Sequence, residues 1–357
     1  MKNMTYKILY IEDLNPDSIM QELSKEPSFD VVHWKPDTIE DIDTKIADVN
    51  AIVMDFRLTE GETKLDGSSY AQAIRTIGSD IHKNLPIVLF SDEDKITDYY
   101  KDFTSQDLFD FSIPKDSFRA NPEKYNTRIL SLLNAYRKIE DDNRDLAKIL
   151  GVNDVTEIDY RIDFTLMKET YAEDVYPYSR FILQNMIRSI GLLIGEDILS
   201  ARLGISKDSG NWEDLKAHLE EFKYTGIFSD SYNRWWAKDI SNWFNSKSEN
   251  NSSLRRLAAS ERCEAIKKIT GLSELDPLTQ IDERGYKAKS SKFWTICKAT
   301  HRAIDYSDGF ELYLRDLKPW QEPEFISFLG ISNGSLMSSV KPADKARIRK
   351  IEQSLRS

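Results

Sequence analysis

Five short apolar runs recur along the first 113 residues, and segments with helical periodicity separate them. The runs span residues 7–11, 30–34, 51–55, 86–90 and 109–113. The helical segments lie near residues 16–25, 38–47, 68–79 and 94–103, and from residue 122 onward. Strands that alternate with helices imply βαβ units. The pattern therefore predicts an α/β N-terminal domain with a flavodoxin-like, doubly wound sheet of five parallel strands.

The second part of the chain has a different pattern, in which apolar positions recur at helical spacing and strand-like runs are absent. Gly, Asn, Asp or Pro residues interrupt segments near 177–194, 212–223, 232–245, 253–269, 290–304 and 343–355. This predicts a mostly α-helical C-terminal domain over residues 152–357.

One predicted helix connects the two parts. It begins at Pro122, and its apolar positions recur as far as Gly151, where the periodicity ends. Residues 140–145 are too polar for a long coiled coil, which needs sustained heptads. We therefore expect a linker helix over residues 141–151 that follows a domain spanning residues 1–140. A signalling helix that forms a dimer interface stays an alternative.

Polar residues stand at or just past the ends of four of the apolar runs. Glu12 and Asp13 follow the first run, Asp55 ends the third, Ser91 follows the fourth, and Lys115 comes soon after the fifth. The carboxyl ends of parallel strands meet at one rim of a sheet, where open α/β sheets bind ligands. These five side chains are therefore predicted to converge there.

Three carboxylates, a hydroxyl and an ammonium group suit one divalent cation and one phosphoryl group. Mg²⁺ prefers oxygen ligands and often takes one or two carboxylates together with waters, which Asp13, Asp55 and Glu12 could supply. An aspartate can act as a covalent nucleophile toward phosphorus, and Asp55 is the candidate. Lys115 would then pair with the phosphoryl oxygens, and Ser91 would donate a hydrogen bond to one of them.

The order of these residues along the chain resembles that of the receiver domain of two-component response regulators, over roughly residues 5–140. The resemblance implies that Asp55 accepts a phosphoryl group from a histidine kinase or phosphotransfer protein. It also implies that Ser91 and Lys115 assist the transfer. The backbone carbonyl of Arg57 would complete the Mg²⁺ site. Such a domain catalyses only its own phosphorylation, so we expect no other enzymatic activity from it.

Several positions depart from the pattern of that family. The loop over residues 56–65 is longer than usual, and the acidic Asp92 follows the hydroxyl residue. Pro114 precedes Lys115 in place of the usual reverse order, and Ser112 stands where an aromatic side chain is expected. These departures leave open a degenerate receiver, which would keep the fold without carrying phosphate.

Charge and cysteine content set further limits on function. The formal net charge is −11, and residues 1–140 hold 26 acidic against 17 basic side chains. An acidic sheet domain suits a metal-binding rim and disfavours general attraction to nucleic acid. The two cysteines, Cys263 and Cys297, have no metal-like spacing. With no signal peptide or long apolar run, the sequence predicts a soluble cytoplasmic protein.

Three tryptophans are the candidate interaction residues of the C-terminal half. Trp235, Trp236 and Trp243 recur at helical spacing, so one helix face is rich in aromatic side chains. Such a stripe is more often core than a docking surface. Both interpretations stay open at this stage.

Nucleic-acid binding is an alternative that the charges do not favour. Residues 197–228 superficially resemble a helix-turn-helix, but the second helix is acidic, whereas phosphate contacts require basic residues. The last 17 residues carry six basic against two acidic side chains, which is also typical of a solvated terminal helix.

Three hypotheses follow for the whole chain. The leading one is a phospho-switch, a receiver that signals through a helical output domain by protein contacts. The second is a DNA-binding transcription regulator. The third is an effector enzyme or a component of a bacterial stress or antiphage system, although residues 152–357 contain no recognisable enzymatic motif.

Overall fold

The structure is a computed structural model that describes residues 4–36, 39–58, 65–76, 84–92, 108–168, 173–249, 252–280, 288–314, 316–332 and 336–356. The chain divides into two units. Unit 1 comprises Met1–Leu183 and Thr225–Ser231, and unit 2 comprises Gln184–Tyr224 and Tyr232–Ser357. This division falls later in the chain than the predicted linker at residues 141–151.

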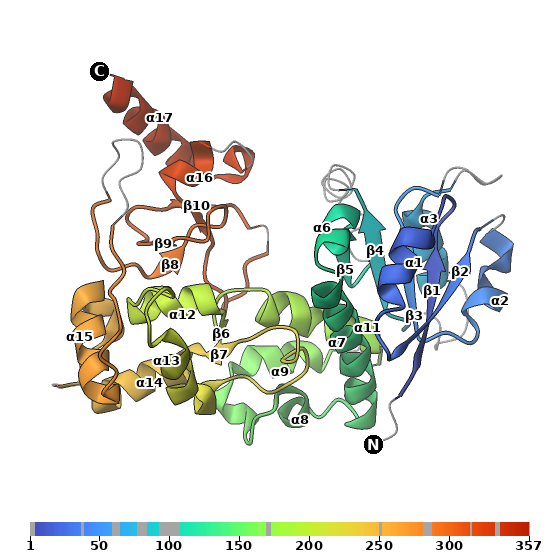
Figure 1. The fold of residues 1–357 in the computed structure, drawn as a ribbon, viewed down its shortest axis with the longest axis horizontal. Helices are drawn as coiled ribbons and strands as arrows, with labels where there is room; N and C mark the ends of the chain where they lie inside the picture. Colours follow the sequence, from blue (N-terminus) through green and yellow to red (C-terminus); the bar gives the residue numbers. More distant parts are fainter. Residues whose placement is uncertain are drawn as a thin grey trace. The chain divides into compact units, whose positions relative to one another are not determined.

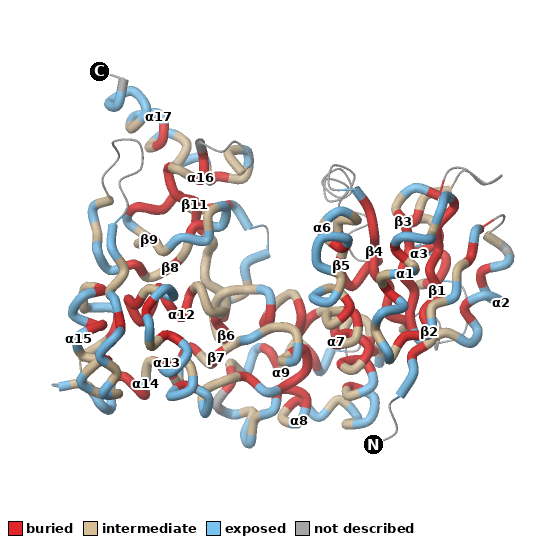
Figure 2. The backbone as a smooth tube through the Cα atoms, in the orientation of Figure 1, coloured by how far each residue is buried: buried red, intermediate tan, exposed pale blue. Residues whose placement is uncertain are grey.

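A five-stranded parallel sheet forms the centre of unit 1 (Figure 1). The strand order is β2-β1-β3-β4-β5, which confirms the predicted flavodoxin-like topology. The central strands carry apolar residues on both faces because helices cover both sides, and Figure 2 shows these strands as buried. The strands are β1 (Tyr6–Ile11), β2 (Phe29–Trp34), β3 (Ala51–Asp55), β4 (Ile87–Ser91) and β5 (Phe111–Pro114).

The helices of the sheet domain form two groups. Helix α1 contacts α6 and α7, whereas α2 contacts α3. The predicted helix near residues 94–103 lies outside the described residues. Helices α1, α2, α3 and α7 lie at or close to the predicted positions, and a 3-10 turn, η1 (Ile39–Asp41), precedes α2. The sequence pattern does not predict α6. The bounds of these helices are α1 (Asp17–Leu23), α2 (Ile42–Ile46), α3 (Gly67–Thr76), α6 (Lys115–Ala120) and α7 (Pro122–Asp141).

The helix that begins at Pro122 does not continue to Gly151, so that prediction is wrong. Helix α7 ends at Asp141, and Asn143 and Arg144 follow in the left-handed region, with φ of 48° and 58°. Helix α8 (Leu146–Leu150) then starts afresh, because the Asp145 side chain accepts hydrogen bonds from two backbone N–H groups of its first turn. The polar residues of this break have no apolar side chain to bury, which removes the packing that would hold a continuous helix.

Residues beyond α8 also belong to unit 1. They form a 3-10 turn, η2 (Val155–Glu157), and the helices α9 (Tyr160–Leu166) and α11 (Val175–Ile182). Helix α11 packs against α7. The Ser131 hydroxyl of α7 donates a hydrogen bond to Asp230, which ties the segment Thr225–Ser231 to the same helix.

The described residues of unit 2 are mostly helical and also form three small antiparallel sheets, β6-β7, β8-β9 and β10-β11. Its helical elements are η3 (Leu183–Ile187), α12 (Glu196–Leu203), α13 (Trp212–His218), η4 (Glu220–Phe222), α14 (Ala237–Lys247), η6 (Leu254–Arg256), α15 (Ala259–Thr270), α16 (Phe328–Ser332), η7 (Met337–Ser339) and α17 (Pro342–Arg356). Its strands are β6 (Leu193–Ile194), β7 (Trp235–Trp236), β8 (Thr295–Ile296), β9 (Ala303–Ile304), β10 (Phe310–Glu311) and β11 (Phe325–Ile326).

The helix predicted over residues 290–304 is wrong, because this segment forms the hairpin β8-β9. Phe293 and His301 adopt positive φ values of 48° and 56°, which a right-handed helix does not allow. The backbone N–H of Cys297 donates to the carbonyl of Arg302 and closes the turn. Among the described helices, none is both long and apolar enough to cross a bilayer.

Candidate functional site

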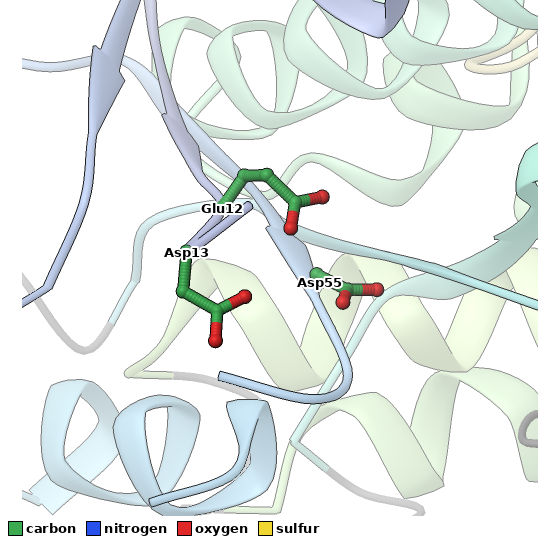
Figure 3. Close-up of side chains that lie close together, drawn as sticks. All are labelled: Glu12, Asp13 and Asp55. Carbon is green, nitrogen blue, oxygen red and sulfur yellow. The ribbon is translucent and has the colours of Figure 1, made fainter. Parts of the chain in front are cut away.

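Each of the five predicted site residues lies at or just beyond the carboxyl end of a strand. Glu12 and Asp13 follow β1, Asp55 ends β3, Ser91 ends β4, and Lys115 begins α6 directly after β5. One carboxylate oxygen from each of Glu12, Asp13 and Asp55 lies within 4.8 Å of the others (Figure 3). The parallel register of the strands thus brings together the acids that the sequence separates by 43 residues.

The start of α3 lies very close to the end of β3, next to the three carboxylates. A Cβ atom at Gly67 would lie 2.4 Å from the backbone carbonyl oxygen of Asp55, so no larger residue fits there. The Gly67 N–H donates to the carbonyl of Phe56 at 2.7 Å. Arg57 forms an isolated antiparallel bridge with Asp66, directly beyond β3. This places the Arg57 backbone near the rim, and its role as a metal ligand stays a prediction.

The three carboxylates are almost completely buried, with 2–4% of each residue exposed. Lys115 is their cationic neighbour: its Nζ lies 2.7 Å from Glu12 Oε2 and 3.1 Å from Asp55 Oδ1. Three carboxylates and one ammonium leave an excess of negative charge in a place that water reaches poorly. A buried site of this kind favours a bound cation.

The pKa values of Asp55 and Lys115 show how the charges act on one another. Burial raises the pKa of Asp55, and the Lys115 ammonium opposes that rise. Burial by itself would lower the pKa of Lys115, but Asp55 and Glu12 outweigh it and hold the pKa above its usual value. Lys115 therefore stays charged at neutral pH and partly compensates the buried carboxylates.

Glu12 is held by groups other than Lys115. The Tyr10 hydroxyl donates to Glu12 Oε2 at 3.0 Å, and the Leu14 N–H donates to Oε1 at 3.2 Å. Tyr10 is a further residue of the site that the sequence pattern does not single out, because it resembles an ordinary apolar residue of a strand. A signal was present, because residues two apart in a strand share a face, and this places the phenol on the side of Glu12.

Ser91 is completely buried, and its hydroxyl has no hydrogen-bond partner among the described residues. A buried hydroxyl without a partner costs about 1–3 kcal/mol. Its position at the end of β4, next to β3 in the sheet, makes it available to a ligand at the rim.

Asp92 and Ser112, two of the departures from the receiver pattern, lie within the described residues. Residues 59–64 of the long loop lie outside the described residues. Asp92 is exposed directly after β4, and Ser112 is half-buried on β5. The rings of Phe90 on β4 and Phe118 on α6 form an aromatic contact, with their centroids 4.9 Å apart.

Comparison with known proteins concerns the N-terminal part alone. No protein-family model matches the chain. No curated protein is significantly similar to it. Several solved structures are similar to the sheet domain. A protein assigned as a response regulator from Chloroflexus aurantiacus J-10-fl is 16% identical over 36% of this chain and 98% of that chain, with a TM-score of 0.29.

Two further solved structures are receiver domains. One belongs to a sensor histidine kinase from Pseudomonas aeruginosa PAO1 and has a magnesium ion coordinated in its active-site cleft. It is 21% identical over 35% of this chain and 96% of that chain, with a TM-score of 0.28. The other, from Clostridium thermocellum, is 15% identical over 35% of this chain and 98% of that chain, with a TM-score of 0.24. The N-terminal third is similar in structure to receiver domains. At these identities the likeness concerns the fold only.

The three candidate tryptophans of unit 2 do not share one helix, because Trp235 and Trp236 form β7 and Trp243 lies in α14. Trp235 and Trp243 are 2% and 7% exposed, within one apolar cluster, and Trp236 packs edge-on against Tyr224. Trp235 and Trp243 thus act as core residues, the alternative that the sequence left open. In unit 1, Tyr160 and Phe164 of α9 and Met167 directly after it are apolar side chains with 77%, 66% and 70% exposure.

Lys216 and Arg347 are two basic residues of unit 2 that are engaged within the unit itself. Lys216 of α13 pairs with Glu196 at 2.9 Å and with Glu213 at 2.7 Å. In α17, the Arg347 guanidinium stacks on Phe310 and donates to two backbone carbonyls. The acidic partners of Lys216 offset its charge on α13, so DNA binding through that helix stays an alternative that is not favoured.

Proposed function

We propose that unit 1 is the phospho-acceptor of a two-component phosphorelay, with Asp55 as the residue that carries the phosphoryl group. The observation that carries this proposal is the buried acidic triad with Lys115 placed between Asp55 and Glu12. Two of the three buried carboxylates, Glu12 and Asp55, share one ammonium, which leaves the triad with an excess of negative charge that suits a functional site.

The donor set of the rim fits Mg²⁺. Carboxylate oxygens are the ligands that this cation prefers, and Asp13, Asp55 and Glu12 would hold it, with the Arg57 carbonyl as a further candidate. When bound, Mg²⁺ would supply neutralising charge for an anionic phosphorus centre. The excess negative charge of the three buried acids supports such a role.

The chain's own residues then have separate roles in the transfer. A carboxylate oxygen of Asp55 forms a bond to phosphorus as the bond from phosphorus to the imidazole nitrogen of a phosphohistidine breaks. That nitrogen keeps the electron pair. The Lys115 ammonium pairs with phosphoryl oxygens, and the Ser91 hydroxyl donates to one of them. The donor of the phosphoryl group would be a histidine kinase or a phosphotransfer protein.

Unit 2 is proposed to transmit this signal through protein contacts, without an enzymatic reaction of its own. Helix α11 and the segment Thr225–Ser231 pack on α7 within unit 1, and the chain continues from each of them into unit 2. This covalent continuity supports the proposal. The contacts with α7 give a change in the sheet domain a direct route to residues that follow it in the chain.

The test of phosphate capture uses the full chain. Acetyl phosphate, or beryllofluoride as a mimic, should modify the wild type only when Mg²⁺ is present. An intact-mass measurement should show the phosphoryl group that acetyl phosphate transfers as acetate leaves. Asp55→Asn should abolish the shift. Asp116→Asn is a matched control, because Asp116 follows Lys115 yet its side chain is 94% exposed and pairs with Arg119. Equal labelling of wild type and Asp55→Asn would refute the assignment.

A further inference from the structure

Strand β1 carries two buried tyrosines on one face, and their hydroxyls have different partners. Tyr6 is 4% exposed and donates to Asn134 Oδ1 on α7 at 2.8 Å. Tyr10 is completely buried and donates to Glu12 Oε2 at 3.0 Å. The first bond anchors a helix, whereas the second reaches the acidic rim.

The oxygen that accepts from Tyr10 is also the oxygen that pairs with Lys115. Lys115 Nζ lies 2.7 Å from Glu12 Oε2 and 3.1 Å from Asp55 Oδ1, so Glu12 and Asp55 together locate the ammonium. A glutamate side chain has three rotatable bonds and locates a partner only if its own rotamer is held. The Tyr10 hydroxyl and the Leu14 N–H hold one carboxylate oxygen each.

We propose that Tyr10 is a positioning residue for phosphoryl transfer. Its hydroxyl holds Glu12 so that Lys115 stays beside Asp55, and this engagement leaves Asp13 and Asp55 as the principal carboxylates for the metal. The inference rests on the proposed role of Asp55. In this arrangement the main role of Glu12 is to hold Lys115, whereas the sequence alone groups Glu12 with the metal ligands.

The phenol suits this role because it can only donate to a buried carboxylate. A phenol has an ordinary pKa of about 10, so its hydroxyl carries a proton to donate at neutral pH. Phenylalanine has the same ring and lacks the donor. Tyr10→Phe thus removes one hydrogen bond with little change in packing.

The experiment compares Tyr10→Phe with Tyr6→Phe in the full chain. Both variants remove one buried phenol hydroxyl from β1, but only Tyr10 contacts the rim. At saturating Mg²⁺ we expect Tyr10→Phe to slow labelling by acetyl phosphate about tenfold, since small displacements of a reacting group cost one to two orders of magnitude. Tyr6→Phe should retain the wild-type rate. The Mg²⁺ dissociation constant should change by less than about twofold in both variants.

A second measurement does not depend on phosphorylation. Acetic anhydride footprinting, read by peptide mass spectrometry, reports how readily the Lys115 amine reacts. Tyr10→Phe should raise the reactivity of Lys115 in the metal-free protein, and Tyr6→Phe should not. This readout distinguishes the two proposals, because it would still respond if the wild type failed to take up phosphate.

Three results would overturn the inference. Labelling of Tyr10→Phe at the wild-type rate would show that the hydroxyl is dispensable. Equal slowing in Tyr6→Phe would indicate a general loss of stability. A parallel fall in Mg²⁺ affinity would mean that Tyr10 supports the metal site in place of the lysine. A double variant, Glu12→Ala with Tyr10→Phe, should be no slower than Glu12→Ala alone, because the tyrosine acts through the glutamate.

Discussion

The guanidinium carbon of Arg75 lies 3.5 Å from the centroid of the Tyr176 ring. This contact joins α3 of the sheet domain, which carries Arg75, to α11, which carries Tyr176. Arg75 also donates to the carbonyls of Leu85 and Leu108, and it lies 3.6 Å from the buried carboxylate of Asp110. One side chain therefore connects the sheet, α3 and α11. This contact explains why residues beyond the predicted linker belong to unit 1.

We predict that Arg75→Ala lowers the free energy of unfolding of unit 1 by up to about 3–5 kcal/mol, because it breaks the buried ion pair between Arg75 and Asp110. Tyr176→Leu removes only the ring face and should cost about 1 kcal/mol in cation–π energy, with a further contribution from changed packing. Urea titration followed by circular dichroism measures both. Losses of less than 0.5 kcal/mol in both variants would show that this contact does not anchor α11.

The raised pKa of Asp55 predicts a pH-dependent effect of neutralising it. A carboxyl group whose pKa is higher in the folded state binds protons more tightly there, so stability falls as pH rises from the unfolded pKa through the folded one. Asp55→Asn should therefore raise the melting temperature of the metal-free protein at neutral pH. The gain should vanish at pH values below the unfolded pKa, about 3.9.

Millimolar Mg²⁺ should raise the melting temperature of the wild type by mass action, and this rise should be lost in Asp55→Asn and Asp13→Asn. Differential scanning fluorimetry with and without EDTA provides the measurement. A wild-type melting temperature that does not respond to Mg²⁺ would favour the degenerate receiver.

Two glycines with positive φ allow the stability cost of a steric contact to be measured apart from the cost of backbone strain. Gly151 has φ of 66°, and a Cβ there would lie 2.5 Å from the Thr225 hydroxyl and 3.0 Å from the backbone of the same segment. Gly271 has φ of 78° and open space around it. Gly271→Ala should cost about 1 kcal/mol through strain alone. Gly151→Ala should cost at least about 1–2 kcal/mol more, because the segment that begins at Thr225 must move. Equal costs would show that this segment yields easily.

Phosphorylation should change the packing of α7 on its neighbours within unit 1. Hydrogen exchange with and without beryllofluoride should reveal altered protection in α7, in residues 142–150 and in Thr225–Ser231, where Ser131 donates to Asp230. The effect should be modest, because a ligand shifts such an equilibrium only by its differential affinity. Changes confined to the rim around Asp55 would contradict coupling through α7.

The sequence alone determined the sheet and the identity of the rim residues. Apolar runs at the spacing of βαβ units are compatible with few sheet topologies. Parallel strands need crossover connections, and these are almost always right-handed. A polar residue at the end of such a run must lie at the carboxyl rim. For that reason Asp55 and Lys115 could be placed together although 60 residues separate them in the chain.

Only the tertiary structure decided how the rim is organised and where the sheet domain ends. Residues 290–304 have helical periodicity, but the backbone forms a hairpin because long-range packing overrides weak local propensity. The bond from Tyr10 to Glu12 depends on side-chain rotamers, and the contact between Arg75 and Tyr176 joins elements about 100 residues apart. Periodicity reports which face of an element is buried, and it does not report which partner covers that face.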